Sequence, residues 1–274
     1  MRLATARLTD RTAAVRLDSD RAVETGDPDV GALLVRPDWR DRAAGANGVE
    51  HPLDTLDYAP LVPSPEKIIC VGQNYGRHIA EMGRQPPAFP TLFAKFRSSL
   101  IGAYDDIVLP AMSDQLDWEV ELAVVIGAPG RHVSVEAANS VIAGYAVLND
   151  VTARDWQSRT TQWLQGKTFE HTTPFGPALV TLDEAPKGGT ELSCRVDGEL
   201  MQRADTTDLV FDAATVVAYV SEIVTLCPGD VIATGTPGGV GHARKPPRYL
   251  VDGTVVRSAI DGIGECCNVC RAEK

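Results

Sequence analysis

Asp117-Trp-Glu-Val-Glu-Leu-Ala-Val-Val-Ile-Gly127 is the stretch that decides the fold, because its β-branched and apolar residues predict a strand with a buried end. Successive side chains of a strand point to opposite faces, so Asp117, Glu119 and Glu121 are expected to face the same space. Carboxylates held that close repel one another and raise one another's pKa. A solvated strand face with arginine partners would explain an isolated acidic pair. Because this set lies in a strongly hydrophobic strand, it favours a metal site.

Composition and charge place the chain among ordinary globular proteins and argue against several classes of partner. Its 274 residues can bury a sizeable core, with 44% apolar and 23% charged residues. The formal charge of −11 argues against nucleic acid or an anionic membrane as the main partner. No apolar run approaches the roughly 20 residues of a membrane helix, and Met1–Thr5 lacks the apolar core of a signal peptide. We therefore expect a cytoplasmic protein that acts on a small molecule.

The cysteines are spaced irregularly. In a chain without an export signal they are more typical of reduced thiols than of a disulfide framework. Cys267-x-x-Cys270 is a single pair with no second pair to complete a zinc site, so we interpret it as structural. The six cysteines are Cys70, Cys194, Cys227, Cys266, Cys267 and Cys270.

The chain is expected to divide into a small N-terminal α/β domain, residues 1–62, and a larger catalytic domain, residues 63–274. The prolines between residues 60 and 65 form a stiff, extended linker. The smaller domain carries no motif, so we expect it to be functionally quiet. Its predicted strands are Leu3–Arg7, Ala13–Leu17 and Ala32–Val35.

A short helix that carries a histidine and a glutamate is expected at residues 74–83. Asn74 suits its N-cap and Gly83 its C′ position. His78 and Glu81 lie three residues apart and so share one face. A carboxylate beside a histidine fixes its tautomer and stabilises the imidazolium, as a general base requires. Such a pair is also common as a surface contact, but the Gly-rich and Pro-rich flanks favour a catalytic lid.

A second group of polar residues follows a strand expected at 144–148, which a predicted helix at 134–142 precedes. Asp150, Arg154 and Gln157 are spaced by four and three residues, so one helical turn could present them together. An N-cap aspartate with an arginine four residues later would explain the same pattern. Both interpretations are open from the spacing.

Lys167 follows a glycine in a run without other charges. The chain has only six lysines, so this one is a candidate partner for an oxyanion or a substrate carboxylate. Farther along, Ala213–Leu226 predicts a helix capped by Asp212. Residues 234–241 predict a tight loop that brings backbone N–H groups and the Thr236 hydroxyl to a ligand. They lack the Gly-Lys-Ser/Thr ending of a nucleotide-binding loop.

Together these segments resemble the fumarylacetoacetate hydrolase family over residues 66 to about 265. Each motif is modest alone, but five of them stand in the family's order, which makes the resemblance specific. The motifs are Val71-Gly-Gln-Asn-Tyr-Gly-Arg-His78, Leu116-Asp-Trp-Glu-Val-Glu-Leu122, Leu148-Asn-Asp-Val-Thr-Ala-Arg-Asp-Trp-Gln157, Gly166-Lys-Thr-Phe169 and Thr234-Gly-Thr-Pro-Gly-Gly-Val-Gly241.

The resemblance implies an α+β, mainly β fold, with a mixed β-roll catalytic domain behind the small N-terminal domain. It also implies a homodimer that acts on a small 2-oxo acid, without nucleic-acid or membrane partners. The cysteine-rich segment 264–270 departs from the family pattern and leaves thiol chemistry at a dimer surface open. One divalent cation per subunit, Mg²⁺ or Mn²⁺, is expected on Glu119, Glu121 and Asp150, with Asp117 outside the ligand set. The implied catalytic residues are His78, Glu81 and Lys167, and the implied substrate contacts are Arg154, Gln157 and Thr236.

A 2-oxo acid can chelate such a cation through its carboxylate and keto oxygens, which stabilises an enolate. We therefore expect hydrolysis of a carbon–carbon bond in a 2,4-dioxo acid, an acylpyruvate such as fumarylpyruvate. His78 with Glu81 would activate water, and Lys167 would stabilise the oxyanion. The same enolate serves oxaloacetate decarboxylation, isomerisation of an oxo diacid and ureidoglycolate-type cleavage, so these reactions stay open. A metal-binding protein without turnover is less favoured, because His78, Arg154 and Lys167 are all retained.

Overall fold

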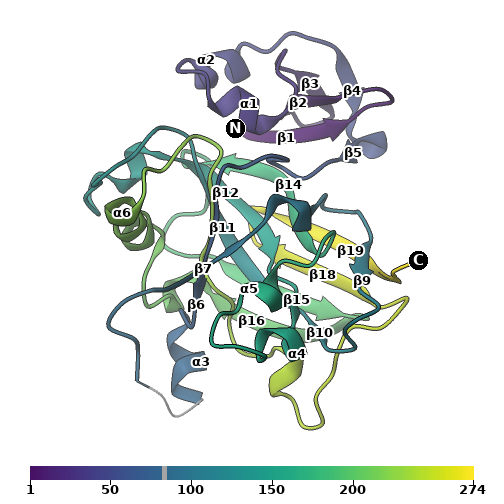
Figure 1. Ribbon diagram of the computed structural model, residues 1–274. Helices are drawn as coiled ribbons and strands as arrows, with labels where there is room; N and C mark the ends of the chain where they lie inside the picture. The colour runs from purple at the N-terminus through teal and green to yellow at the C-terminus, as the bar shows by residue number, and fades with distance from the viewer. Residues whose placement is uncertain (82–84) are drawn as a thin grey trace.

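The computed structural model of the protein describes residues 1–81 and 85–274, apart from the side chains of residues 78, 80 and 81 (Figure 1). Within the described residues, strands make up most of the regular structure and form three sheets, with short helices around them. The mainly β, α+β fold predicted from the sequence is confirmed.

The largest sheet runs from the N-terminal lobe through the middle of the molecule (Figure 1). Its strands are β1 (Arg2–Arg7), β2 (Thr12–Leu17), β3 (Arg21–Glu24), β4 (Glu50–Pro52), β5 (Asp57–Tyr58), β6 (Ile68–Gly72), β7 (Thr91–Lys95), β8 (Leu100–Ile101), β11 (Val120–Ile126), β12 (Ile142–Asn149), β14 (Thr173–Thr181) and β17 (Val231–Ala233). The order is β4-β3-β2-β1-β14-β12-β11-β17-β6-β7, with β5 paired to β1 and β8 paired to β14. Neighbours are antiparallel except at β17–β6 and β14–β8.

A second sheet packs against the middle of the first. It has the order β16-β15-β18-β19-β9. Val120, Leu122 and Val147 of the first sheet share one buried apolar cluster with Val256 and Ile260 of the second, which is the packing expected of two facing sheets. The bounds are β9 (Ile107–Leu109), β15 (Glu191–Val196), β16 (Glu199–Asp205), β18 (Val255–Ile260) and β19 (Gly264–Ala272), and a separate two-stranded sheet joins β10 (Leu116–Asp117) to β13 (Thr152–Ala153).

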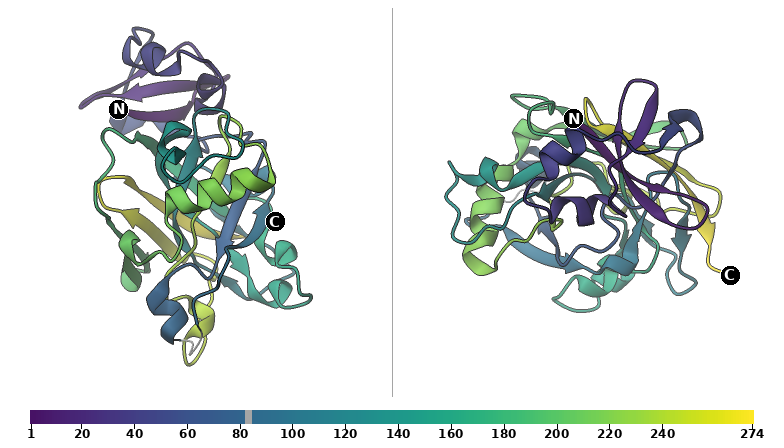
Figure 2. Two further views of the ribbon diagram at one scale, coloured as in Figure 1. Left: turned by 90° about the vertical axis from the view of Figure 1, so that its left-hand side faces the viewer. Right: turned by 90° about the horizontal axis from the view of Figure 1, so that it is seen from above.

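The helices are short and lie around the sheets. Helix α6 packs Val216, Val217 and Val220 against Val124 and Ile232 of the large sheet, and Figure 2 shows it lying along one flank of the body. None of the helices in the described ranges is long and apolar enough to cross a membrane. The helices are α1 (Val30–Leu34), α2 (Trp39–Ala44), α3 (Gly76–Glu81), α4 (Arg154–Gln157), α5 (Leu164–Lys167) and α6 (Ala213–Ile223), and the 3₁₀ turns are η1 (Leu53–Thr55), η2 (Arg97–Ser99), η3 (Ala138–Ser140), η4 (Thr206–Asp208) and η5 (Gly241–Ala243).

Strands β1–β5 and helices α1 and α2 form the small lobe at the top of Figure 1. Its sheet is continuous with the larger body, because β1 pairs antiparallel with β14. The strand expected at Ala32–Val35 is wrong, since this segment belongs to α1 and its C-terminal end. Asp29 Oδ1 accepts a hydrogen bond from Ala32 N–H at 2.8 Å, and this N-cap starts the helix.

The helix expected at 134–142 is also wrong. The short turn η3 forms there, and β12 follows at once. The flanking backbone is bonded to other segments: Val133 N–H donates to Ser221 Oγ at 2.8 Å, and Val141 C=O accepts from Gly127 N–H at 2.8 Å. These tertiary hydrogen bonds override the local helical preference.

The strand that carries the acidic residues is interrupted between β10 and β11. Asp117 Oδ1 accepts hydrogen bonds from the N–H groups of Trp118 at 2.9 Å and Gly241 at 2.6 Å. Glu119 N–H donates to Asn149 Oδ1 at 2.8 Å. Because these N–H groups bond to side chains, the ladder breaks where the carboxylates lie.

All six cysteines are free thiols, as the sequence predicts. Cys266 and Cys270 of β19 are buried in the apolar cluster between the two sheets. Burial raises the pKa of Cys270 to about 12, so this thiol stays protonated at neutral pH. The two buried thiols therefore act as packing groups.

The N-cap of α6 offers a test of the fold. Asp212 accepts a hydrogen bond from Thr215 N–H at 2.8 Å, as predicted. Asp212→Ala should lower the free energy of unfolding by about 1 kcal/mol, because the first helical N–H groups lose their acceptor. Asp212→Ser keeps an acceptor and should retain most of the stability. Urea unfolding followed by circular dichroism measures both variants, and equal losses would contradict the capping role.

Candidate active site

Two neighbouring strands bring three carboxylates together. Glu119 directly precedes β11 and Asp150 directly follows β12, and the strands run antiparallel with Val120 opposite Asn149. Asp150 N–H donates to Glu119 C=O at 2.8 Å, which closes this end of the pair. Glu121 lies two residues farther on the same face. Carboxylate oxygens of Glu119, Glu121 and Asp150 all lie within 4.8 Å of one another and are buried.

An asparagine side chain fixes the bend before β11. Asn149 Oδ1 accepts from Glu119 N–H at 2.8 Å, and its Nδ2 donates to Ser258 Oγ at 2.8 Å. Ser258 belongs to β18, so the second sheet orients the amide that holds the backbone of Glu119. Asn149 and Ser258 are fully buried, and losing either bond would leave a buried polar group unpaired.

Three cationic side chains neutralise the carboxylates. Lys167 Nζ donates to Glu119 Oε2 at 2.6 Å and to Asp150 Oδ2 at 2.7 Å. Lys95 Nζ donates to the other oxygen of Asp150 at 2.7 Å. Arg154 Nη2 lies 2.7 Å from Glu119 Oε1. All these residues are buried, so their ion pairs are screened far less than surface pairs.

Burial and neighbouring charges set the protonation states of the cluster. Burial, with the charges of Asp150 and Glu119 added, raises the pKa of Glu121 well above its usual range. Burial also opposes ionisation of Asp150, but Lys167 and Lys95 outweigh it and hold its pKa below the usual range. Burial likewise opposes the charge on Lys167, yet Asp150 and Glu119 outweigh it and raise its pKa. Lys167 is therefore charged at neutral pH. Glu121 is the carboxyl group whose charge the neighbouring cationic side chains compensate least.

The carboxylate set fits a hard divalent cation. Among the described residues its three donors are carboxylate oxygens, without histidine or cysteine, and Mg²⁺ and Mn²⁺ prefer oxygen donors. When Asp117 is counted, four carboxylates meet three cationic side chains, which leaves one formal negative charge. Burial is the main cause of the raised pKa of Glu121, and the like charges of Asp150 and Glu119 add to it. A divalent cation would offset the excess negative charge.

Arg154 is held from two sides. Its Nε donates to Asp117 Oδ2 at 2.8 Å, and its Nη1 donates to Gln157 Oε1 at 3.1 Å. Asp117 also accepts from the N–H groups of Gly241 and His242, so it lies outside the carboxylate set, as expected, and supports Arg154. An arginine has no acceptor, so Gln157 turns its oxygen toward Arg154, and Gln157 also lines the cavity.

The glycine-rich loop after β17 reaches the same site. Gly235 N–H donates to Glu121 Oε2 at 2.8 Å, and its φ of +102° is a conformation that favours glycine. Thr236 Oγ donates to Val120 C=O at 3.0 Å and accepts from Gln202 Nε2 at 2.8 Å. The Thr236 hydroxyl proton is thus used by the backbone, so in this arrangement the hydroxyl could meet a ligand only as an acceptor.

A cavity of about 160 Å³ opens over the carboxylates. Phe93 and Trp163 form an aromatic wall, with ring centroids 5.4 Å apart in an edge-to-face arrangement. The cavity brings together every predicted site residue whose side chain is described except Asp150, which lies in contact with Lys167. The lining residues are Val71, Gly72, Gln73, Phe93, Glu119, Glu121, Arg154, Gln157, Trp163, Lys167, Thr236 and Val240.

The predicted histidine–glutamate pair is only partly covered by the structure. Helix α3 contains both His78 and Glu81. Their side chains, and the expected C′ residue Gly83, lie outside the described residues. The pairing of His78 with Glu81 therefore stays a prediction.

Asn74 does not cap α3, contrary to the sequence prediction. Its Nδ2 donates to the C=O groups of Phe211 and Thr234, both at 2.8 Å, and its Oδ1 accepts from Phe211 N–H at 2.8 Å. The first turn of α3 is instead served by Asp208, whose Oδ2 accepts from Arg77 N–H at 3.1 Å. Asn74 was misjudged because its partners come from a distant part of the chain.

The sequence reasoning also missed four groups of the site. Lys95 could have been found, because a lysine at the end of the apolar segment 91–95 is unusual in a chain with six lysines. Phe93 and Trp163 carry no local signal that distinguishes them from ordinary core aromatics. Gln202 gave no signal, since its partner Val120 lies 82 residues earlier in the chain.

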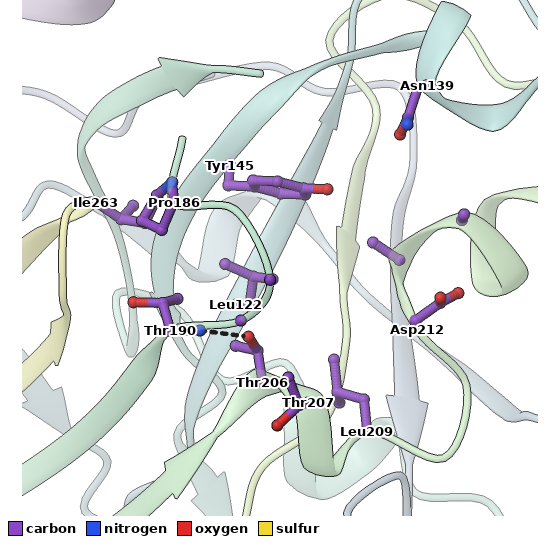
Figure 3. Close-up of a pocket in the computed structure, with 14 residues that line it drawn as sticks. Leu122, Asn139, Tyr145, Pro186, Thr190, Thr206, Thr207, Leu209, Asp212 and Ile263 are labelled. Atoms are coloured by element: carbon purple, nitrogen blue, oxygen red, sulfur yellow. Dashed lines mark hydrogen bonds between the residues drawn. The ribbon is translucent and has the colours of Figure 1, made fainter. Parts of the chain in front are cut away.

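A larger cavity of about 510 Å³ lies beside α6 and holds none of the predicted site residues (Figure 3). Figure 3 shows Tyr145, Thr190, Thr206 and Leu209 around it, with Asp212 near its rim. Asp212 is the one acidic group among its described lining residues, and it already caps α6. The smaller cavity has the convergent charged groups typical of an active site.

Comparisons with known proteins show which proteins the chain resembles. The family profile described as "Fumarylacetoacetate (FAA) hydrolase C-terminal" matches residues 67–271. A mitochondrial oxaloacetate tautomerase of Homo sapiens is 46% identical over 230 residues, which cover 83% of this chain and 73% of that protein. The structure of a fumarylacetoacetate hydrolase from Exiguobacterium antarcticum matches with a TM-score of 0.90 at 36% identity. The structure of a 5-carboxymethyl-2-hydroxymuconate delta-isomerase from Mycobacterium smegmatis matches with a TM-score of 0.84 at 33% identity. Each match covers 100% of both chains.

Cation binding should be measurable as stability. With Mn²⁺ at about 100 times its Kd, the free energy of unfolding should rise by about 2.7 kcal/mol. Glu121→Ala should remove this gain, because it deletes one of three oxygen ligands. Glu136→Ala changes an exposed carboxylate outside the set and should keep the gain. Thermal melting with Mn²⁺ and with EDTA provides the readout, and a full gain in Glu121→Ala would contradict the assigned site.

Proposed function

The chain belongs to the fumarylacetoacetate hydrolase family, as its five motifs predict, and from this premise we propose that this enzyme interconverts the keto and enol forms of oxaloacetate. The carboxylate set of Glu119, Glu121 and Asp150, placed beside buried cations in a small cavity, carries the proposal. The relative at 46% identity, named an oxaloacetate tautomerase, supports the substrate and the reaction.

Charge supports a dicarboxylate as the substrate. The described cluster has one formal negative charge, and a divalent cation would change it to one positive charge. A positively charged cavity attracts a dianion more strongly than a neutral ketone. When held by Glu119, Glu121 and Asp150, the cation would act as a Lewis acid on the keto oxygen and favour the enol form.

The side chains of the cavity then take distinct roles. The guanidinium of Arg154 and the NH₂ group of Gln157 offer donors for a carboxylate of the substrate. Lys167 is charged and already aimed at the carboxylate set, so it can meet negative charge that develops on the substrate oxygen. His78, supported by Glu81, would take a proton from the substrate carbon, and a proton would be delivered to the keto oxygen, so that a C–H bond is broken and an O–H bond is formed.

Hydrolysis of an acylpyruvate is the second candidate. It uses the same chelated 2-oxo acid end and adds attack of water on the distal carbonyl, with His78 as the base. The match to a fumarylacetoacetate hydrolase at a TM-score of 0.90 favours keeping it. Oxaloacetate decarboxylation needs no activated water, and oxo-diacid isomerisation needs only proton movement, so both follow from the same cavity.

Two expectations from the sequence stay predictions. A homodimer is implied by family resemblance, and a cytoplasmic location by the sequence of this chain. The human relative is named mitochondrial, which is a property of that protein.

A turnover screen separates the candidate reactions. With Mg²⁺, the protein should accelerate the loss of the ultraviolet absorbance of enol-oxaloacetate, whereas faster cleavage of acetylpyruvate or fumarylpyruvate would favour hydrolysis. His78→Ala should slow keto–enol exchange by roughly 10²–10⁴-fold, because a general base is lost. Metal-assisted decarboxylation should suffer less. Arg77→Ala, an exposed neighbour on α3, serves as the control. No acceleration by the unmodified protein would overturn the proposal.

Lys167→Met distinguishes charge stabilisation from substrate binding. If Lys167 meets charge that develops during the reaction, kcat should fall more than KM rises. If it only binds a carboxylate, KM should rise at nearly constant kcat. Removing one partner of a buried ion pair typically destabilises by roughly 3–5 kcal/mol, so melting temperatures are recorded in parallel. Lys187→Met, an exposed lysine, is the matched control.

A further inference from the structure

Trp163 occupies a fixed position relative to Lys167. It directly precedes helix α5, and its C=O accepts a hydrogen bond from Gly166 N–H at 2.9 Å. Trp163 and Lys167 are four residues apart, a spacing that places both on one side of a helical turn. Both line the small cavity. The indole therefore lies one turn away from the ammonium that contacts Glu119.

The indole is supported from behind by backbone. A Cβ added to Gly72 at the end of β6 would lie 2.3 Å from a ring carbon of Trp163, so the ring packs directly on the glycine. The next residue, Gln73, lines the cavity and has a φ of +56°, a left-handed conformation that is costly for a residue other than glycine. The ring cannot retreat toward β6 without moving this turn.

The aromatic wall of the cavity lies close to its charged groups. Phe93 contacts Trp163 edge to face, and the Lys167 ammonium lies 4.9 Å from the centroid of Phe93. At about 160 Å³, the space is small beside the roughly 300–1,000 Å³ of sites for drug-sized ligands. In so small a cavity, a ligand that chelates a cation on Glu119 and Glu121 also lies near the indole of Trp163.

We propose that the indole of Trp163 limits how far a substrate extends beyond its 2-oxo acid end, so that the site selects a four-carbon dicarboxylate over longer oxo acids. A longer acid would bring its chain and second carboxylate against the indole of Trp163, which cannot give way because the ring packs directly on Gly72. A short acid keeps that carboxylate within reach of Arg154 and Gln157. This inference rests on the proposed function, because it takes the 2-oxo acid end to lie at the carboxylate set.

Calorimetric titration in Mg²⁺ with oxalate and with 2-oxoadipate tests the size limit without requiring turnover. Oxalate represents the chelating end alone, and 2-oxoadipate adds a longer acidic chain. Trp163→Ala should tighten binding of 2-oxoadipate by about tenfold, equivalent to about 1.4 kcal/mol, and should change oxalate binding little. The affinity of Trp163→Phe for 2-oxoadipate should lie between those of the unmodified protein and Trp163→Ala.

Two further variants separate size selection from general loosening. Trp156→Ala makes the same truncation at an indole that packs on Phe169 and does not line the cavity, and it should leave the ratio of the two affinities unchanged. Gly72→Ala should push the Trp163 ring into the cavity and weaken 2-oxoadipate binding more than oxalate binding.

The outcomes distinguish the size limit from the proposed function. If Trp163→Ala binds both ligands as the unmodified protein does, or loses both equally, the indole is only a structural wall and the inference is overturned. If oxaloacetate is not turned over but the affinity ratio still depends on Trp163, the proposed function fails and the size limit stands. Absence of oxalate binding by the unmodified protein would overturn both.

Discussion

The interaction on which the site depends is one buried ammonium shared by two carboxylates. Lys167 Nζ bonds to Glu119 and Asp150, while Lys95 holds the other oxygen of Asp150. Buried charges are tolerated only when they are paired, and removing one partner leaves the others uncompensated. The cluster therefore acts as a unit whose geometry exists before substrate binds. Such preorganised charge can stabilise a transition state without reorganising during the reaction.

The second sheet holds this unit from outside. Gln202 of β16 accepts from Val120 N–H at 3.0 Å and donates to Thr236 Oγ at 2.8 Å and Pro237 C=O at 2.9 Å. Ser258 of β18 bonds to Asn149, which holds the backbone of Glu119. These contacts join the ends of β11 and β12, in the first sheet, to β16 and β18 of the second sheet. The packing of two sheets thus does more than bury apolar side chains, because it sets the spacing of the carboxylates.

Local patterns predicted the parts of the site that local geometry decides. Glu119 and Glu121 follow from the two-residue period of a strand, and Asp212 from the preference of aspartate for an N-cap. The site residues that were missed or misplaced share a different cause. Asn74 was expected to cap its own helix but bonds to residues 137 and 160 positions later, and Lys95 meets its carboxylate 55 positions away. A polar side chain whose partner lies far away in the sequence produces no periodic pattern that could predict the contact.

The carboxylate cluster cannot by itself decide which reaction occurs, because tautomerisation, isomerisation and hydrolysis all begin at a chelated 2-oxo acid. Hydrolysis additionally requires a water molecule beside the distal carbonyl, and a water takes up about 30 Å³ in the liquid. In a cavity of about 160 Å³, that volume competes with a longer substrate. The aromatic wall of Phe93 and Trp163 borders this space, and Lys167 lies close to both the wall and the carboxylate set. We therefore expect the choice between proton transfer and hydrolysis to depend on the wall, with the charged cluster supplying the step that the reactions share.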